Sequence, residues 1–391
     1  MRRHSRKLFF AILFVAASIV AFTVAAPLYV DAQANTVALP SPYKASAKAY
    51  ALHSKLFVAD LHDDALLWSR DILIRYSYGH TDLPRLREGR VSLQVFSTVT
   101  KTPKALNFDS NGADTDNITM LAMAQRWPRR TWSSLIERAL YQSEKLHTAA
   151  LNSEGKLRII RSQVDFHDAL KMQLDGRGLL AGILSTEGLH ALGGNIDNVD
   201  RLYVAGFRIA GLTHFFDNEI GGSAHGLRKS GLTPFGRDVV GKLEAKKIIV
   251  DLAHASPTLI DDVLAMAKRP VIISHTGVKG TCPGPRNISD AHIKAIATAG
   301  GIIGIAYFEG AICDLSPHGI VKAIQYATSI AGVKHVALGS DFDGAAKSAI
   351  DTTGLVLITQ GLLDAGFTES DIGDIMGGNI QRFLMTQLPE R

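Results

Sequence analysis

The chain has 391 residues, of which 46% are hydrophobic and 20% are charged, with 35 glycines and 13 prolines. This composition excludes an intrinsically disordered protein and a small disulfide-stapled scaffold, and the length suffices for one large barrel or two ordinary domains. The formal net charge is +5, but residues 1–34 carry +3 of it, and the remainder holds 38 basic and 36 acidic residues. Such a balanced body argues against a nucleic-acid partner.

The first segment has the three parts of an export signal: a positive start, an uncharged apolar run, and small residues at a cleavage site. These parts are Arg2 to Lys7, Leu8 to Ala26, and Ala32-Gln33-Ala34. We interpret residues 1–34 as a signal peptide; because the apolar run is 19 residues long, an uncleaved N-terminal membrane anchor is the alternative. Either way, the body from about Asn35 is expected outside the cytoplasm, in the periplasm or the extracellular space, with membrane contact only through this segment.

From Leu56 onward, short apolar runs rich in β-branched residues alternate with helical patterns. Their continuously apolar character is typical of parallel strands that are buried on both faces. A polar segment between the second and third runs, Asn107–Ser153, predicts a helical insertion. In chain order, the eight predicted strands are Phe57–Asp64, Val91–Thr100, Leu179–Thr186, Phe207–His214, Ile248–His254, Pro270–His275, Gly301–Phe308 and His335–Asp341.

The segments between these strands carry helix start signals. Ser256-Pro257 offers an N-cap and a first-turn proline, and apolar residues follow at helical spacing as far as Ala267. Ser289 and Ser316-Pro317 begin two further helices in the same way. Eight strands alternating with helices predict an α/β fold, a (β/α)8 TIM-type barrel in a single domain over residues 35–391, with the insertion around 107–153. A doubly wound open sheet is the alternative, but no glycine-rich phosphate-binding sequence follows the first strand.

The chain has two cysteines, Cys282 and Cys313. An even count suits an exported protein, in which disulfides persist. The predicted strands place both residues in neighbouring loops, which favours a bridge between them. Two buried, unpaired cysteines are the alternative.

Ionisable side chains gather where the predicted strands end. In a barrel, these ends point to one face, where metal and substrate chemistry takes place. A single histidine after an apolar run is usually structural, and a single aspartate is often a helix N-cap. Burying many such groups together is costly unless a cation compensates them. The strand ends read Leu61-His62-Asp63-Asp64, Thr186-Glu187-Gly188, Thr213-His214, Ala253-His254, Ser274-His275 and Asp341-Phe342-Asp343-Gly344.

This convergence of imidazoles and carboxylates predicts a site for Zn²⁺ or a related divalent ion. His62 and Asp64 are two residues apart on a strand, so both side chains can face the same side.

At this point the sequence resembles a known family, the membrane dipeptidase (renal dipeptidase) family of zinc peptidases. The resemblance spans roughly Phe57 to Leu384, and it rests on several motifs in one order. Besides His62-Asp63-Asp64 and Glu187-Gly188, the matching stretches are Leu212-Thr213-His214, Gly231-Leu232-Thr233-Pro234-Phe235-Gly236, Val250-Asp251-Leu252-Ala253-His254-Ala255-Ser256, Pro270-Val271-Ile272-Ile273-Ser274-His275, Arg286-Asn287, Gly339-Ser340-Asp341-Phe342-Asp343-Gly344 and Gly378-Asn379-Ile380.

The resemblance implies a binuclear zinc site with two Zn²⁺ ions per chain. His62 and Asp64 would hold one ion, His254 and His275 the other, and Glu187 would bridge them. The implied activity is hydrolysis of the amide bond of dipeptides through a metal-bridging hydroxide.

The resemblance also implies roles for residues around the metals. Asp341 would be the catalytic carboxylate, which transfers the proton to the leaving amine. His214 and Arg286 would bind substrate, with His214 also stabilising the developing oxyanion. Cys282 and Cys313 match a disulfide of the family.

Two departures from the family leave the ligands intact. Asp63 stands where the family commonly has asparagine, and Leu189 replaces the second glycine that some relatives have after Glu187. The second strand also lacks the family's glycine-rich aromatic pattern, which puts the substrate preference in doubt. The alternatives are an N-acyl amino acid deacylase or lactonase on the same barrel, and a non-catalytic exported binding protein; a homodimer is also compatible with the sequence.

Overall fold

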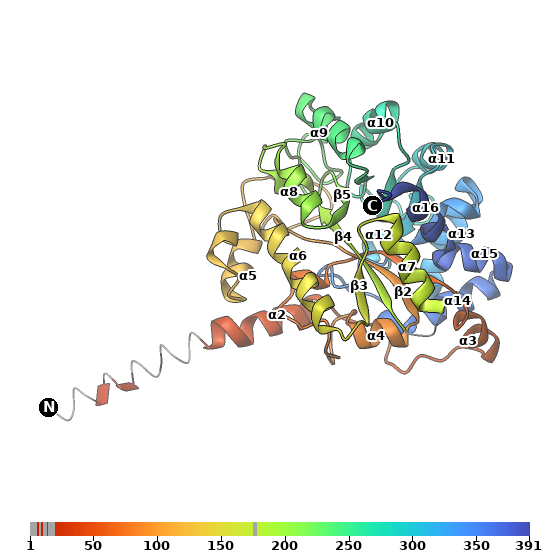
Figure 1. Cartoon of the computed structure of the whole chain (residues 1–391), viewed down its shortest axis with the longest axis horizontal. Coiled ribbons are helices and arrows are strands. Elements are labelled where there is room, and N and C mark those ends of the chain that lie inside the picture. Colours follow the sequence, from red (N-terminus) through yellow and green to blue (C-terminus); the bar gives the residue numbers. More distant parts are fainter. Residues whose placement is uncertain (1–5, 8, 11–13, 15–19, 175–177) are drawn as a thin grey trace.

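The structure, a computed structural model, describes residues 6, 7, 9, 10, 14, 20–174 and 178–391. A ring of helices surrounds a central sheet (Figure 1). Part of the predicted export signal, residues 1–5, 8, 11–13 and 15–19, lies outside the described residues.

Eight parallel strands close into a barrel, which confirms the predicted TIM-type fold. The order around the barrel is β2-β1-β9-β8-β7-β6-β5-β4, and pairing of β2 with β4 closes it. Each of the eight predicted strands overlaps one of these barrel strands. Their bounds are β1 Val58–Asp63, β2 Val91–Phe96, β4 Leu180–Glu187, β5 Phe207–Gly211, β6 Ile249–Asp251, β7 Ile272–Thr276, β8 Ile302–Ile305 and β9 Val336–Leu338.

A ninth strand, β3 (Leu157–Ile159), was not predicted. It pairs with the beginning of β4, on the side opposite β2. From Leu184 onward, β5 pairs with β4 on the same side as β3. Three residues with a charged Arg158 in the middle are too short and too polar to produce a strand pattern.

The strands bury both faces, as their continuous apolar character predicts. Along β6 and β7, Ile249 and Ile272 belong to a cluster inside the barrel, whereas Val250 and Ile273 pack outward against the helices. The inner cluster includes Phe383 of the last helix, α16 (Asn379–Gln387), which closes the amino-terminal end of the barrel. The opposite, carboxyl-terminal end is therefore the open one.

Capping side chains set the start of several helices around the barrel. Ser256 accepts a hydrogen bond from the backbone N–H of Leu259 at 3.0 Å, and α10 (Pro257–Met266) begins directly after it, as predicted. The same cap precedes α11 (Asp290–Thr298) and α13 (Pro317–Ala331). The other outer helices are α3 Ala47–His53, α4 Leu83–Glu88, α7 Gln163–Leu174, α8 Asn198–Val204, α9 Pro234–Ala245, α12 Glu309–Ile312, α14 Val356–Asp364 and α15 Glu369–Gly373.

The segment between β2 and β3 is helical. It contains α5 (Ile118–Ala124), a short turn at Arg129–Thr131, and α6 (Leu135–Asn152), which lie together at one side of the barrel (Figure 1). Near α5 lies α2 (Ala26–Ala34), the last part of the predicted export signal. No helix within the described part of the chain is both long and apolar enough to cross a membrane.

Cys282 and Cys313 form a disulfide, with their Cα atoms 5.4 Å apart. Cys282 lies in the loop after β7, and Cys313 directly follows α12. The bridge therefore connects the loops after two neighbouring strands, as the sequence predicts.

Candidate metal centre and active site

The carboxyl ends of the barrel strands bring the predicted metal ligands together. His62 lies in β1, Glu187 is the last residue of β4, and His275 lies in β7. Asp64 and His254 lie in the loops that follow β1 and β6. Each of these five residues is at most 5% exposed, so the five side chains form one buried cluster.

Glu187 is the common neighbour of the histidines. Its Oε1 lies 3.0 Å from Nε2 of His254 and 3.3 Å from Nε2 of His275, and these two nitrogens are 3.0 Å apart. Ligand atoms about 2.1 Å from a tetrahedral zinc ion lie about 3.4 Å from one another. The triangle of these three atoms is therefore close in size to one face of a zinc coordination shell.

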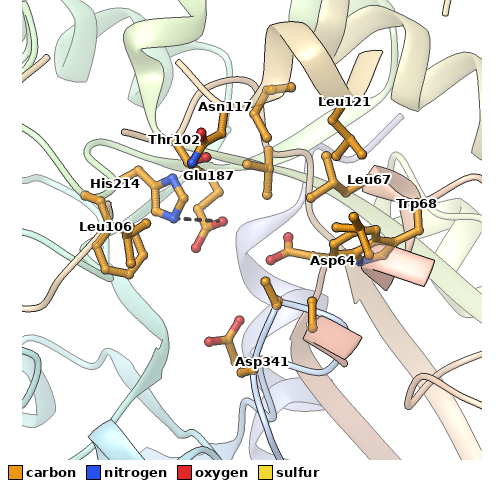
Figure 2. A pocket seen from close by; sticks show the side chains of 18 of the residues that line it. Asp64, Leu67, Trp68, Thr102, Leu106, Asn117, Leu121, Glu187, His214 and Asp341 are labelled. Carbon is orange, nitrogen blue, oxygen red and sulfur yellow. Dashed lines mark ion pairs between the residues drawn. The ribbon is translucent and has the colours of Figure 1, made fainter. Parts of the chain in front are cut away.

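A second group of ligand atoms adjoins the first. Nε2 of His62 lies 3.6 Å from Oε1 of Glu187, 3.6 Å from Oδ1 of Asp64 and 3.9 Å from Oδ1 of Asp341. Nε2 of His214 lies 3.3 Å from Oε2 of Glu187 (Figure 2). His214 and Asp341, predicted as substrate-binding and catalytic residues, thus lie directly beside the predicted ligands.

Burial keeps three of the imidazoles neutral. It lowers the pKa of His214, His254 and His275 well below the usual histidine value. Burial would also lower the pKa of His62, but the charges of the neighbouring carboxylates, led by Asp64, outweigh it and raise that pKa to about 10. Neutral imidazoles offer the lone pairs that metal binding requires.

Burial makes ionisation of two carboxyl groups of the cluster, Glu187 and Asp341, unfavourable. Burial raises the pKa of Glu187 well above its usual value, and the charge of Asp64 raises it further. Burial also raises the pKa of Asp341 to about 7, although the positive charge of His62 acts against it. Anions buried this close together need positive charge beside them, and divalent cations would supply it.

Two unpartnered atoms show where such a cation fits. Among the described residues, Nε2 of His62 and Oδ1 of Asp64 are buried without a hydrogen-bond partner. Buried polar atoms are rarely left unpaired, and imidazole nitrogen with carboxylate oxygen is a donor set that zinc accepts. The residues present therefore fit a metal centre.

Two buried aspartates hold the backbone next to the ligands. Oδ1 of Asp60 accepts hydrogen bonds from the backbone N–H of His62 at 2.9 Å and of Ser340 at 3.1 Å. Oδ1 of Asp251 accepts one from the N–H of Ser274 at 2.8 Å, next to His275. Neither aspartate had a predicted role; the signal in the sequence is an acid within an otherwise apolar strand, shortly before a histidine.

The acids Asp63 and Asp343 support the structure. Oδ1 of Asp63 accepts a hydrogen bond from the N–H of Ala65 at 3.1 Å. Asp343 pairs with the guanidinium of Arg70 at 2.9 Å and accepts a hydrogen bond from the N–H of His80 at 2.7 Å. Although burial opposes it, Arg70 and His80 lower the pKa of Asp343, so this aspartate is a charged anchor for the loop that carries the catalytic candidate.

The cluster opens into a cavity of about 580 Å³. Arg286, a predicted substrate-binding residue, lines this cavity, is 4% exposed, and donates a hydrogen bond to the carbonyl of His275 at 2.9 Å. Asp64, Glu187, His214 and Asp341 point into the space between the strand ends and the surrounding loops (Figure 2). The remaining wall is mainly apolar and includes Leu67, Trp68, Leu106, Leu121, Phe215 and Phe308.

Comparison with known proteins assigns the chain to a family. Residues 46–388 match the family described as membrane dipeptidase (peptidase family M19). The dipeptidase aclJ of Aspergillus oryzae is 27% identical over 353 residues, which cover 84% of this chain and 77% of that protein.

Solved structures share the fold. The probable dipeptidase PvdM of Pseudomonas aeruginosa has a TM-score of 0.72 at 18% identity, over 86% of this chain and 97% of that one. A metallopeptidase of Rhodobacter sphaeroides, liganded with a phosphinate mimic of the dipeptide L-Ala-D-Ala, has a TM-score of 0.69 at 21% identity, over 85% of this chain and 99% of that one. The chain belongs to the membrane dipeptidase family, peptidase family M19, and is a metal-dependent dipeptidase.

Proposed function

We propose that the protein is an exported zinc dipeptidase with two Zn²⁺ ions in each chain. His62 and Asp64 would hold one ion, His254 and His275 would hold the other, and Glu187 would serve both. The observation that carries this assignment is the position of Oε1 of Glu187, within 3.6 Å of Nε2 of all three histidines. The pattern of the N-terminal segment and the disulfide support export.

Different residues around the ions carry different steps of amide hydrolysis. When bound, the zinc ions supply a hydroxide nucleophile at neutral pH and polarise the scissile carbonyl. Asp341 accepts the proton of the nucleophile and delivers it to the leaving amine, a role open to a carboxyl that lies 3.9 Å from His62 and lines the cavity. His214 lines the same cavity and stabilises the charge that develops on the carbonyl oxygen.

Arg286 supplies recognition of a free C-terminal carboxylate. Its guanidinium lines the cavity, and its Nε is buried without a hydrogen-bond partner among the described residues. A carboxylate can accept two parallel hydrogen bonds from a guanidinium. The cavity volume of about 580 Å³ falls within the usual range for small-molecule sites, and a dipeptide mimic is the ligand of the related Rhodobacter sphaeroides structure.

A substrate panel with and without metal tests the proposal. The panel contains Ala-Ala, Ala-D-Ala, their C-terminal amides, N-acetyl amino acids and a lactone. We expect hydrolysis of the free dipeptides, a kcat/KM at least about tenfold lower on the amides, loss of activity in chelator, and recovery with Zn²⁺. Metal analysis should find two zinc ions per chain.

The variant His254→Ala should lose zinc and activity together. Its matched control is His318→Ala, which removes an imidazole that is 82% exposed and does not line the cavity, and which should keep both. Full activity without metal, or turnover of N-acetyl amino acids alone, would refute the proposal.

A further inference from the structure

The helix α2 forms part of the wall of the substrate cavity. Phe22, Ala26, Val30 and Ala34 line the cavity that also contains the metal ligands. These residues are four apart, so they form one stripe on the helical segment. α2 packs near α5, which supplies residues such as Leu121 to the same wall (Figure 1).

A buried ion pair fixes α2 to the barrel. Asp31 is 0% exposed, and its Oδ2 lies 2.7 Å from Nε of Arg70. The same guanidinium pairs with Asp343 at 2.9 Å, two residues after Asp341. Asn35 completes the connection, because its Nδ2 donates to Oδ1 of Asp31 at 2.8 Å and its Oδ1 accepts from the N–H of Ala345 at 2.9 Å.

Cleavage after Ala34 is incompatible with this arrangement. It would remove Asp31 and leave one side of the Arg70 guanidinium unpaired. It would also separate Asn35 from Asp31, whose carbonyl accepts a hydrogen bond from the Asn35 N–H at 3.0 Å and whose Oδ1 accepts one from Nδ2 at 2.8 Å. Cleavage would therefore break the contacts that hold α2 in place.

We propose that α2 stays in the working enzyme, where it forms one wall of the substrate cavity and favours dipeptides with a large apolar side chain. Two observations support this proposal: one stripe of α2 residues lines the cavity, and a buried ion pair between Asp31 and Arg70 holds α2 in place. The preference follows from the wall that α2 and α5 share, which is apolar where a substrate side chain would lie. This specificity rests on the proposed dipeptidase function, whereas the retention of α2 does not.

The first test is the N-terminus of the native protein. The full-length gene is expressed, the protein is extracted from whole cells with detergent, and its intact mass and N-terminal sequence are determined. We expect a mass that includes residues 26–34. A protein that begins at Asn35 overturns the proposal.

The second test compares two neighbouring residues of α2. Val30→Gln places a polar side chain in the cavity wall, and Tyr29→Gln, the matched control, makes a similar change at a residue that is 67% exposed and outside the wall. We expect Val30→Gln to lower kcat/KM on Leu-Leu about tenfold and on Gly-Gly less than about twofold. Tyr29→Gln should leave both unchanged.

The outcomes separate the two proposals. Equal kcat/KM values of Val30→Gln and wild type on both substrates would overturn the role of α2 in specificity. If the zinc-loaded protein hydrolyses no dipeptide at all, the proposed function fails, and the N-terminal analysis still decides whether α2 is retained.

Discussion

Asp341 is largely buried and also lines the cavity, so its carboxyl group can exchange a proton with a bound substrate. Burial raises its pKa to about 7, and its side chain is 13% exposed. We expect Asp341→Asn to lower kcat by at least about 100-fold, because an amide cannot accept the proton and pass it on. Steady-state kinetics should show little change in KM, and metal analysis should show unchanged zinc content.

The control for this variant is Asp364→Asn, the same chemical change at an exposed residue of α14, which should keep wild-type kcat. A loss of zinc together with activity would make Asp341 a metal ligand, and near wild-type turnover would remove it from the mechanism.

Single residues differ in how far the sequence reveals them. His62 and Asp64 were identifiable because both stand at the polar end of a predicted apolar strand, although β1 itself ends at Asp63. Arg70 was not, because its role depends on contacts with Asp31 and Asp343, from opposite ends of the chain. A local sequence pattern carries no information about such contacts.

At the scale of elements, the strands that run through the core were predictable, because each is long enough to produce an apolar run. The residues at which the strands end were harder to predict. The predicted second strand extends to Thr100, but β2 ends at Phe96. Beyond it the chain stays buried and makes an isolated bridge between Val99 and Glu187, so apolar character continues after regular pairing has ended.

Close packing of β7, β8 and β9 beside the metal centre depends on two glycines. A Cβ atom on Gly304 or on Gly339 would overlap the carbonyl oxygen of Ser274, and Oγ of Ser274 lies 2.8 Å from Nδ1 of His275. We expect Gly339→Ala to lower the free energy of unfolding by about 1–3 kcal/mol. It should also weaken zinc binding, because it displaces His275. Denaturant unfolding of the chelated protein and a zinc titration measure the two effects.

The matched control is Gly241→Ala in α9, where an added Cβ meets nothing within 4 Å. Because alanine is the better helix former, this variant should gain about 0.5–1 kcal/mol and keep wild-type zinc affinity. If Gly339→Ala behaved in the same way, the close approach of these strands would not constrain the site.

At the scale of the whole molecule, the barrel could be predicted because eight strands in alternation with helices leave few other arrangements. The barrel in turn predicted which side chains meet, since all the strand ends point to one face. The position of α2 could not be predicted in this way. Its apolar residues satisfy an export signal equally well, and only the folded chain shows that they also border the cavity.

Stability against acid is a property of the whole fold, and His53 provides a test of it. His53 in α3 is 5% exposed; its Nδ1 lies 2.8 Å from Oγ1 of Thr359 in α14, and its Nε2 lies 3.1 Å from the carbonyl of Gly89 after α4. Burial lowers the pKa of His53 below its usual value, so the unfolded chain takes up a proton that the folded chain excludes. The stabilisation is therefore complete above the ordinary histidine pKa of about 6.5, and it is lost as the pH falls below that value, by up to about 1.4 kcal/mol per pH unit.

The comparison that isolates this residue is urea unfolding of the chelated protein at pH 7.5 and pH 5.5. Wild type should lose more stability between these pH values than His53→Gln, by at most about 1.4 kcal/mol, because glutamine has no proton to take up at this position. The control His318→Gln makes the same chemical change at a side chain that is 82% exposed, and it should change the stability by less than about 0.5 kcal/mol. If the free energy of unfolding fell by the same amount in wild type and His53→Gln, protonation of His53 would not destabilise the folded protein. The contact between α3 and α14 would then tolerate a charged imidazole.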